Sequence, residues 1–413
     1  MYAGRADQAS RQKVIGVSLG DPQLLREITG EIQRTGPITF ARFMELALYH
    51  PLHGYYMRGR EDDAGEPIGW SGDFYTSSDL HPALAQSLAR QARQVDELLG
   101  CPDRFTVLEM GAGKGLLARD FLADCEVNAE PFFARLHYVI IERSLVMKAR
   151  QRRQLAPWMA SAGRVSWLNG LEGLTTGGLV GVVLSNELVD AFPVHRIRVD
   201  QGEAEEVFVD YEGGRFCERL RPVSNPELLQ YLDRLTRMGV KLADGYTTEM
   251  NLHAMAWMRE VARILGHGVV ITIDYGHTAP DLYAPERGKG TLLCYHQHRL
   301  SEHPYVRVGC QDMTAHVDFS ALAAVGQESG LHVTGFTNQM SFLIGLGLED
   351  KLASLEPDSS EFESVVRLLR PEGMGRTFKV LIQHKGLDQP ELDGLRFKPF
   401  FESSLTVAGV SGQ

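Results

Sequence analysis

The chain has 413 residues, of which 44% are apolar and 23% are charged. These fractions match those of ordinary soluble globular proteins, so they exclude the disordered, collagen-like and disulfide-scaffold classes. Lys and Arg number 42 against 53 for Asp and Glu, a net charge of −11, and because a surface of that sign suits a phosphate backbone poorly, we expect no nucleic-acid partner.

The cysteines and the apolar runs indicate the cellular setting. Five scattered cysteines without a C-x-x-C pair favour a reducing compartment and no metal site. The amino terminus lacks the apolar core of a secretory signal, and no run approaches the ~20 apolar residues of a membrane span. The sequence therefore predicts a cytoplasmic protein without membrane insertion.

The first segment, residues 1–101, is helical and rich in loops, and we expect it to form an amino-terminal lid region. Asp21-Pro22 supplies an N-cap and a proline at the first helical position, and apolar residues follow at helical spacing. The helices predicted here run over about 22–34, from Thr39 and from near Pro82.

From Thr106 onward, short apolar runs alternate with helical patterns, which is typical of βαβ units and a parallel sheet. Seven strands are predicted, at Thr106–Met110, His137–Glu142, Val165–Leu168, Gly181–Ser185, Gly268–Asp274, Leu331–Phe336 and Phe378–His384. They belong to an α/β core with halves 102–199 and 266–386, followed by a carboxyl-terminal tail, 387–413.

The segment between the fourth and fifth strands is too long for a plain crossover. Its apolar runs around Gly213-Gly214 predict antiparallel strands, and a helix is expected over Asn251–Leu265, capped by Gly266. We interpret residues 200–265 as an insertion over the sheet edge where ligands of open α/β sheets bind. It would serve as a substrate clamp or as a dimer contact.

The sharpest local signal is EMGAGKG, residues 109–115, at the end of the first strand. Its E-x-G-x-G-x-G pattern is carried by Glu109, Gly111, Gly113 and Gly115. A dinucleotide fingerprint needs a further glycine where this chain has Leu116. The pattern instead indicates a class I methyltransferase turn around the amino-acid half of S-adenosylmethionine, with a glycine turn used only for packing as the alternative.

An acidic residue follows at the end of the second strand. Glu142 is positioned to accept hydrogen bonds from the two vicinal hydroxyls of a ribose. This fits an adenosyl cofactor and a dinucleotide equally well. The alternative is an exposed carboxylate paired with Arg143.

Polar side chains follow the fourth strand at Asn186, Glu187 and Asp190. The loop after this strand crosses the switch point of a doubly wound sheet, so these side chains should face the reacting group. One explanation is a helix start, with Asn186 as N-cap and the two acids favoured by the helix dipole. The other is capture of a cationic nucleophile beside the sulfonium.

Seven segments, in order from about residue 21 to 386, resemble the MidA family of S-adenosylmethionine-dependent methyltransferases. They are GPITFARFMELALYHPLHGYYM, GDFYTSSDL, LEMGAGKG, LSNELVDAFPVHR, ITIDYGH, DMTAHVDFSAL and MGRTFKVL. The resemblance implies a seven-strand class I, Rossmann-like α/β fold with an amino-terminal helical region and an insertion after the fourth strand. It implies S-adenosyl-L-methionine as cofactor and S-adenosyl-L-homocysteine as product.

The same resemblance implies partners and further residues. Mitochondrial members of the family include the protein-arginine methyltransferase that assists assembly of respiratory complex I. Arginine methylation of a partner protein, with a complex I subunit as one candidate, is therefore expected, as is a mitochondrial location if the chain is eukaryotic. A homodimer is considered. The family signature over residues 72–77 implies that Phe74 and Thr76 contact the cofactor and that Asp73 lies near the transfer site.

This chain departs from the usual family pattern at two places. Lys114 stands where the family usually has Arg, before Leu116-Leu117 in place of a Thr-Leu pair. Ser78-Asp79 stands where Pro-Glu or Pro-Gln is common. Cofactor binding should survive these changes, whereas the inherited substrate identity is weakened.

Arginine methylation adds one chemical demand, because the guanidinium stays protonated. Carboxylates must bind it by charge-assisted hydrogen bonds and localise electron density on the attacking nitrogen. Glu187, aided by Asp190 or Asp73, is the residue that we expect to perform this task.

Four residues further along the chain are candidates for the acceptor side. Asp274 closes the fifth strand and lines the acceptor channel or forms a strand-end turn. The others, expected as substrate-side or loop-bracing groups, are His298, Asp312 and His316. Asp318 is expected to cap the helix that begins at Phe319.

Other functions stay open at this point. They are a small-molecule O- or N-methyltransferase, a non-catalytic assembly factor that binds the cofactor, and an NAD-dependent oxidoreductase, which Leu116 disfavours. An acidic cavity wide enough for a peptide would favour the protein substrate, and a sealed apolar pocket would favour the small molecule.

Overall fold

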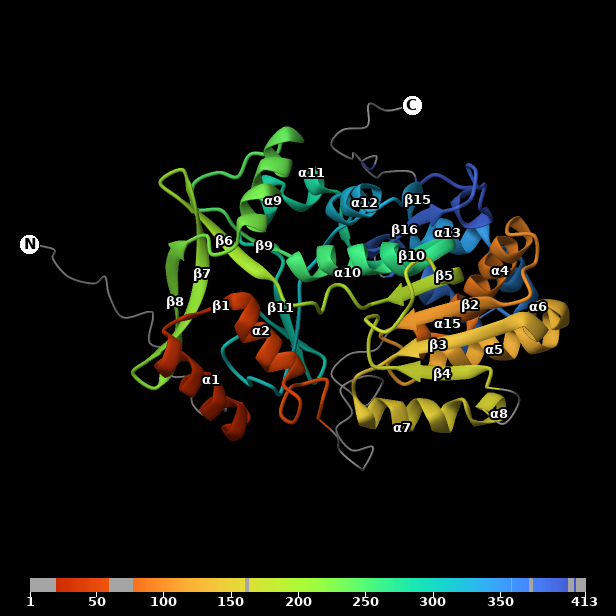
Figure 1. The fold of residues 1–413 in the computed structure, drawn as a ribbon, viewed down its shortest axis with the longest axis horizontal. Helices are drawn as coiled ribbons and strands as arrows, with labels where there is room; N and C mark the ends of the chain where they lie inside the picture. Colours follow the sequence, from red (N-terminus) through yellow and green to blue (C-terminus); the bar gives the residue numbers. More distant parts are fainter. Residues whose placement is uncertain are drawn as a thin grey trace, which may run out of the picture.

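The molecule has two lobes (Figure 1), one built on an eight-stranded sheet and the other on a five-stranded sheet. The computed structural model describes residues 20–58, 77–159, 163–357, 359–370, 374–399 and 405. None of the helices in these ranges combines the length and the apolar character needed to cross a bilayer.

The large sheet contains a strand at each of the seven expected ranges. These strands are β2 (Phe105–Met110), β3 (Leu136–Ile141), β4 (Val165–Leu168), β5 (Leu179–Asn186), β10 (Leu265–His277), β15 (His332–Asn338) and β16 (Phe378–Lys385). Their order is β15-β16-β10-β5-β2-β3-β4, and only β16 runs antiparallel to its neighbours among them. An eighth strand, β14 (Val317–Asp318), pairs with the end of β10. It was not expected from the sequence, because two residues are too few to give a strand pattern.

Helices cover both faces of this sheet. One face carries α4 (Ala83–Leu98), α5 (Leu116–Asn128), α6 (Glu130–Arg135), α13 (Gln339–Gly345), α14 (Leu348–Ser354) and α15 (Ser360–Leu369). The other carries α9 (Pro226–Arg237), α10 (Leu252–Ile264), α11 (Ala279–Leu282) and α12 (Phe319–Glu328). Alternate residues of β10 enter the two cores, with Ile271 on the first face and Val270 on the second.

Shorter elements complete this lobe. They are α3 (Ser77–Leu80), α7 (Leu145–Gln154), α8 (Ala156–Met159) and the 3₁₀ turns η1 (Pro285–Arg287) and η3 (Asp393–Leu395). Two helices on the large sheet have side-chain N-caps, and Asp318 is the one expected from the sequence. The side chain of Asn251 accepts from the Ala254 N–H at 2.8 Å, and that of Asp318 accepts from the Ala321 N–H at 3.0 Å.

The second lobe combines the insertion with the first two helices. Its sheet contains β1 (Ile38–Thr39), β6 (His195–Asp200), β7 (Glu203–Glu212), β8 (Arg215–Pro222) and β9 (Thr247–Met250), in the order β1-β7-β6-β9 with β8 on β7. A three-stranded sheet of β11 (Leu293–His296), β12 (Arg299–Ser301) and β13 (Asp312–Thr314) packs nearby. The helices α1 (Pro22–Thr35) and α2 (Phe40–Tyr49) have Asp21 and Thr39 as N-caps, as predicted.

Two expected boundaries differ from the structure. Residues 1–101 do not act as one region, because α1 and α2 pack on the insertion, whereas α4 packs on the large sheet. The insertion ends at β9, because α10 returns to the large sheet and passes directly into β10, where Leu265 pairs with Leu179. Gly266 therefore lies in a strand and is not a helix cap.

Candidate active site

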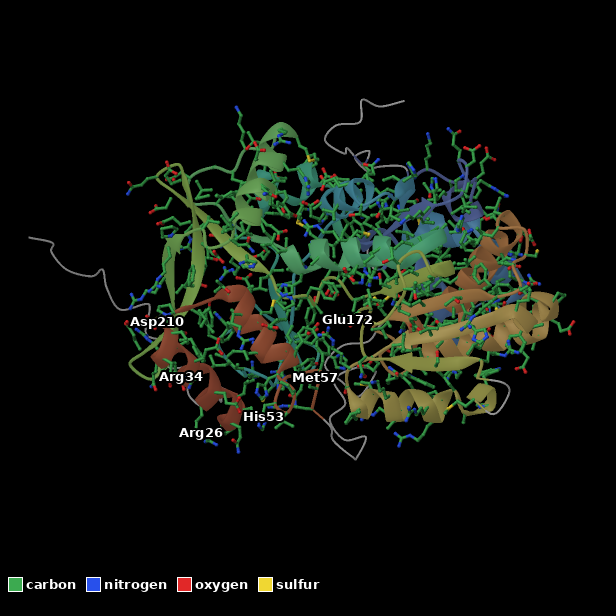
Figure 2. All side chains as sticks on the ribbon, viewed as in Figure 1. Arg26, Arg34, His53, Met57, Glu172 and Asp210 are labelled. Carbon is green, nitrogen blue, oxygen red and sulfur yellow. The ribbon has the colours of Figure 1, made fainter. Side chains whose placement is uncertain are left out.

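A cavity of about 490 Å³ lies at the carboxyl edge of the large sheet, a volume typical of small-molecule sites. The ends of β2, β3 and β5 line one side of it. Residues Tyr49, Tyr56 and Met57 of the second lobe and four residues of α10 complete the wall. Figure 2 shows Met57 and Glu172, which both line the cavity, near the middle of the molecule where the lobes meet.

The glycine turn forms part of this wall. Gly111 has φ of 74°, a conformation that L side chains rarely adopt, and a Cβ there would lie 2.9 Å from Cδ1 of Leu188, so the Leu188 side chain would have to shift. Gly113 also lines the cavity, and its carbonyl accepts a hydrogen bond from Gln151 Nε2 at 2.8 Å. Gly115 instead precedes α5, at φ of 83°.

Glu142 follows β3 and lines the cavity. Its Oε1 accepts from the Ser144 N–H at 2.7 Å, and its Oε2 accepts from Gln151 Nε2 at 3.1 Å. The remaining lone pairs on the two oxygens can accept from two hydroxyls. Arg143, the alternative partner, has its guanidinium 4.0 Å from Glu172 instead.

Two buried side chains of the wall, Glu109 and Asn186, carry acceptor oxygens. Glu109 Oε2 accepts from the Tyr138 hydroxyl at 2.8 Å, and burial raises the pKa of Glu109 to about 7. Oδ1 of Asn186 is buried without a hydrogen-bond partner among the described residues. Acceptors of this kind suit the ammonium group of an amino acid, so the wall fits the amino-acid half of an adenosyl cofactor.

Glu187 carries a partly buried carboxyl group on the same wall. Its Oε1 accepts from the Ser77 N–H at 2.9 Å and from Asn186 Nδ2 at 3.2 Å. Burial, with the neighbouring charge of Asp190, raises the pKa of Glu187 to about 8. Residues 187–194 contain turns and no helix, so the explanation of Asn186 as a helix N-cap is wrong.

Asp274 supports the loop that carries Glu187. It is fully buried, and its Oδ2 accepts from the backbone N–H groups of Leu188, Val189 and Asp190 at 3.2, 2.9 and 3.3 Å. It does not line the cavity, so the expected role in the acceptor channel is corrected to that of a brace. Asp190 lies behind the wall, where it accepts from the Tyr275 hydroxyl, and burial raises its pKa to about 6.

The other three acceptor-side candidates do not line the cavity. Asp312 is buried and accepts from the hydroxyl of Tyr56 at 2.6 Å, so it braces a wall residue. His316 Nδ1 lies 3.2 Å from Nε2 of His277. His298 is exposed in the turn between β11 and β12. Their distances from the cavity depend on how the two lobes meet, which the sequence pattern does not show.

Asp73, Phe74 and Thr76 lie outside the described residues. The sequence reasoning also missed residues that line the cavity. Trp257, His253 and Glu260 come from α10, Tyr49 from α2, and Glu172 from the loop after β4. Of these residues, Glu172 is the one that the sequence could have indicated, because the loop that carries it leaves the same carboxyl edge of the sheet.

The two departures from the family pattern contact each other. Lys114 Nζ lies 2.5 Å from Oδ1 of Asp79, and the Asp79 side chain is 3% exposed. The pair joins α3 to the glycine turn, and both residues line the cavity.

The buried carboxyl groups make stability depend on pH. Because the folded-state pKa of Glu109 is raised from 4.5 to about 7, the native state retains a proton that the unfolded chain releases. We expect the unfolding free energy of the wild type, relative to Glu109→Gln, to fall by on the order of 3 kcal/mol as pH rises through this window. Urea titrations of both proteins at several pH values check this; a difference that is constant with pH contradicts it.

Comparisons with known proteins agree with this geometry. A family model described as an S-adenosyl-L-methionine-dependent methyltransferase matches residues 87–337. The mitochondrial protein arginine methyltransferase NDUFAF7 homolog of Drosophila melanogaster is 26% identical and covers 91% of this chain and 87% of its own length. The human protein arginine methyltransferase NDUFAF7, also mitochondrial, is 25% identical, with coverages of 94% and 89%.

A solved structure is similar over almost the whole chain. It comes from Burkholderia thailandensis and holds S-adenosyl-homocysteine. It is 32% identical to this chain, with a TM-score of 0.80, and covers 92% of this chain and 97% of that one. A native structure from the same organism has a TM-score of 0.79.

Proposed function

This chain belongs to the MidA family of S-adenosyl-L-methionine-dependent methyltransferases, and we propose that the group it methylates is an arginine guanidinium of a partner protein. The observation that carries the proposal is Glu187, a partly buried carboxyl group on the cavity wall with Asp190 behind it. A carboxylate shielded from water is costly unless a cation pairs with it, and a guanidinium would supply that charge. The names of the fly and human relatives support the same acceptor.

The electrostatics of the cavity also favour a cationic acceptor. Among the described residues, seven acidic side chains line it: Glu45, Asp79, Glu109, Glu142, Glu172, Glu187 and Glu260. Within the part of the wall that the structure describes, only Lys114 and Arg143 oppose them with permanent positive charge, and Lys114 is paired with Asp79. A wall of this sign raises the local concentration of a cationic side chain. It supports the protein substrate over a neutral or anionic small molecule.

The residues of the wall fit the cofactor. When bound, S-adenosyl-L-methionine supplies a methyl group on a positively charged sulfur. Glu142 would hold the ribose hydroxyls, and Glu109 and Asn186 would hold the ammonium group beside the glycine turn. An acidic wall also suits the sulfonium charge.

Glu187 would then orient the acceptor. Its carboxylate can take two N–H groups of a guanidinium in a fork, which fixes the plane of the acceptor and leaves the third nitrogen free to attack. Positioning of this kind, in a cavity shielded from water, accounts for much of the catalysis in transfer reactions. Transfer releases one proton from the methylated nitrogen, and a carboxylate of the acidic wall would accept it.

Several finer points stay predictions. They are a respiratory complex I subunit as acceptor, a homodimer, the roles of Asp73, Phe74 and Thr76, and the substrate-clamp or dimer role of the insertion. The relatives are named as mitochondrial, so we favour that compartment over the cytoplasm if the chain is eukaryotic.

Binding of S-adenosylhomocysteine provides the first test. We expect calorimetry to give a dissociation constant in the micromolar range and to show no binding of NAD. Glu142→Ala should weaken S-adenosylhomocysteine binding by about a hundredfold, because two charge-assisted hydrogen bonds are lost. The exposed Glu130→Ala is the matched control. Binding of NAD, or equal affinity in both variants, would contradict the cofactor site.

The acceptor is tested separately with tritiated cofactor and a panel of acceptors. Label in arginine of a protein or peptide supports the proposal. Label only in small metabolites would favour the small-molecule methyltransferase, and no transfer despite cofactor binding would favour the non-catalytic assembly factor.

A further inference from the structure

Gln151 is a fully buried amide behind the wall of the cavity. It belongs to α7, which lies next to β4 (Figure 1), and Met147, one turn earlier on the same helix, lines the cavity itself. A buried glutamine must satisfy its two N–H groups and its carbonyl oxygen within the protein. The partners of Gln151 therefore indicate what its side chain holds in place.

Both polar atoms of the Gln151 side chain have hydrogen-bond partners. Nε2 donates to the carbonyl of Gly113 at 2.8 Å and to Oε2 of Glu142 at 3.1 Å. Oε1 accepts from Nε1 of Trp167 at 2.9 Å. An amide turned by 180° would bring its oxygen against two acceptors and its N–H groups against the indole N–H. The three contacts therefore fix one orientation of the amide.

These contacts join the parts of the wall that would hold the two halves of the cofactor. Gly113 belongs to the glycine turn, where the amino-acid half would bind. Glu142 follows β3, where the ribose would bind. One side-chain amide therefore sets the position of the glycine turn relative to the carboxylate for the ribose.

Gly115 allows Gln151 to come this close to the turn. A Cβ on Gly115 would lie 3.2 Å from Cγ and 3.3 Å from Cα of Gln151, so α7 would have to give by a few tenths of an ångström. The φ of 83° at Gly115 is also one that L side chains rarely adopt. The third glycine of the EMGAGKG pattern is therefore explained by the close approach of Gln151.

The amide also favours the charged form of Glu142. Burial raises the pKa of Glu142, and hydrogen bonds from the Ser144 N–H and from Gln151 oppose that rise. A carboxylate that is held by one donor on each oxygen presents its remaining lone pairs in fixed directions. Each of the two vicinal hydroxyls of a ribose can then meet one oxygen.

We propose that Gln151 is a positioning residue of the cofactor site, which orients Oε2 of Glu142 toward one ribose hydroxyl and ties this carboxylate to the glycine turn. The inference rests on the proposed role of Glu142 in binding the ribose. It goes further because it assigns selection of the ribose hydroxyls to a buried side chain behind the wall. Support of this kind keeps a binding group within the narrow geometry that recognition needs.

The test compares S-adenosylhomocysteine with its 2′-deoxy and 3′-deoxy analogues by calorimetry on the full chain. In the wild type, we expect the loss of either hydroxyl to weaken binding by about tenfold. Gln151→Met keeps the length of the side chain and removes its polar atoms, so the penalty for one of the two hydroxyls should fall to about threefold or less. A purely structural role would weaken all three ligands equally and leave both penalties unchanged.

A second variant and a matched control accompany Gln151→Met. Trp167→Phe removes only the indole N–H that orients the amide, so it should lower the same penalty by a smaller amount. It keeps the inference open to refutation if Gln151→Met does not fold. The control is Gln154→Met, the same substitution at an exposed position of α7, which should leave both penalties unchanged.

The outcomes separate this inference from the proposed cofactor site. If both penalties keep their wild-type values in Gln151→Met and in Trp167→Phe, Gln151 does not position the carboxylate and the inference is overturned, whereas Glu142 keeps its role. If Glu142→Ala itself leaves both penalties unchanged, the ribose does not bind to Glu142. The proposed role of Glu142 and the inference would then fail together.

Discussion

Replacing Glu187 by Gln is expected to lower kcat for arginine methylation by about a thousandfold, because the amide cannot stabilise the charge of the guanidinium as methyl transfer proceeds. The cofactor does not need this carboxylate, so S-adenosylhomocysteine affinity should stay within about twofold. Single-turnover transfer of tritiated methyl to an arginine peptide, beside calorimetry, measures both quantities.

The matched control is Glu260→Gln, which removes a carboxylate from the same wall on α10. It should keep most of the activity. The pH profile adds an independent readout. Because the pKa of Glu187 is raised to about 8, kcat/KM of the wild type should rise by about tenfold per pH unit up to that value. Full activity in Glu187→Gln would contradict the assignment of Glu187 as the residue that orients the acceptor. The same would follow if kcat/KM of Glu187→Gln depended on pH as steeply as that of the wild type.

Replacing Asp274 by Ala is expected to lower the free energy of unfolding by about 4 kcal/mol, because several buried backbone N–H groups lose their acceptor together. These include the N–H groups of Leu188, Val189 and Asp190, which share one oxygen of Asp274. Tyr275 N–H donates to the other oxygen at 2.9 Å. Urea unfolding of the two proteins measures the difference.

Asp274→Asn is the informative companion. Burial and the nearby Asp190 hold the pKa of Asp274 well above its ordinary value, so the neutral acid is favoured and an amide keeps an acceptor oxygen of similar shape. We expect Asn to cost less than about 2 kcal/mol. Equal destabilisation by Ala and Asn would show that the hydrogen bonds to the loop contribute little.

The same loop explains how Glu187 is held in an unfavourable backbone conformation. Its φ is 54°, a region that costs a non-glycine residue about 1–2 kcal/mol. The Glu187 N–H donates to the carbonyl of Ile273 at 3.0 Å, and Asp274 binds the next three N–H groups. The surrounding hydrogen bonds therefore fix the carboxyl group toward the cavity, as strained residues at functional sites require.

Lys114 and Asp79 form an ion pair between two segments that depart from the family pattern. Lys114 and Asp79 each stand in one of the two segments where the sequence departs from that pattern, and Lys114 Nζ lies 2.5 Å from Asp79 Oδ1. The two segments therefore meet at the contact between α3 and the glycine turn. Glu109, Gly111, Gly113 and Glu142 remain on the cavity wall.

The sequence by itself determined the elements whose signals are local. Short apolar runs located the seven strands, and short-range capping chemistry located Asp21 and Asp318 as N-caps and Thr39 at the start of its helix. The glycine turn and Glu142 were found in the same way, because a strand end, a tight turn and an acidic residue are close together in the chain.

Tertiary structure alone decided which distant segments meet. The pairing of Ile38 with Val209 draws α1 and α2 into the second lobe, and no local period encodes a contact over that separation. Trp257 has the spacing of a core residue, yet the meeting of the lobes leaves it on the cavity wall. Asp274 differs from Glu187 for the same reason: both are acids at strand ends, but only the packed loop determines which of them is covered and which faces the cavity.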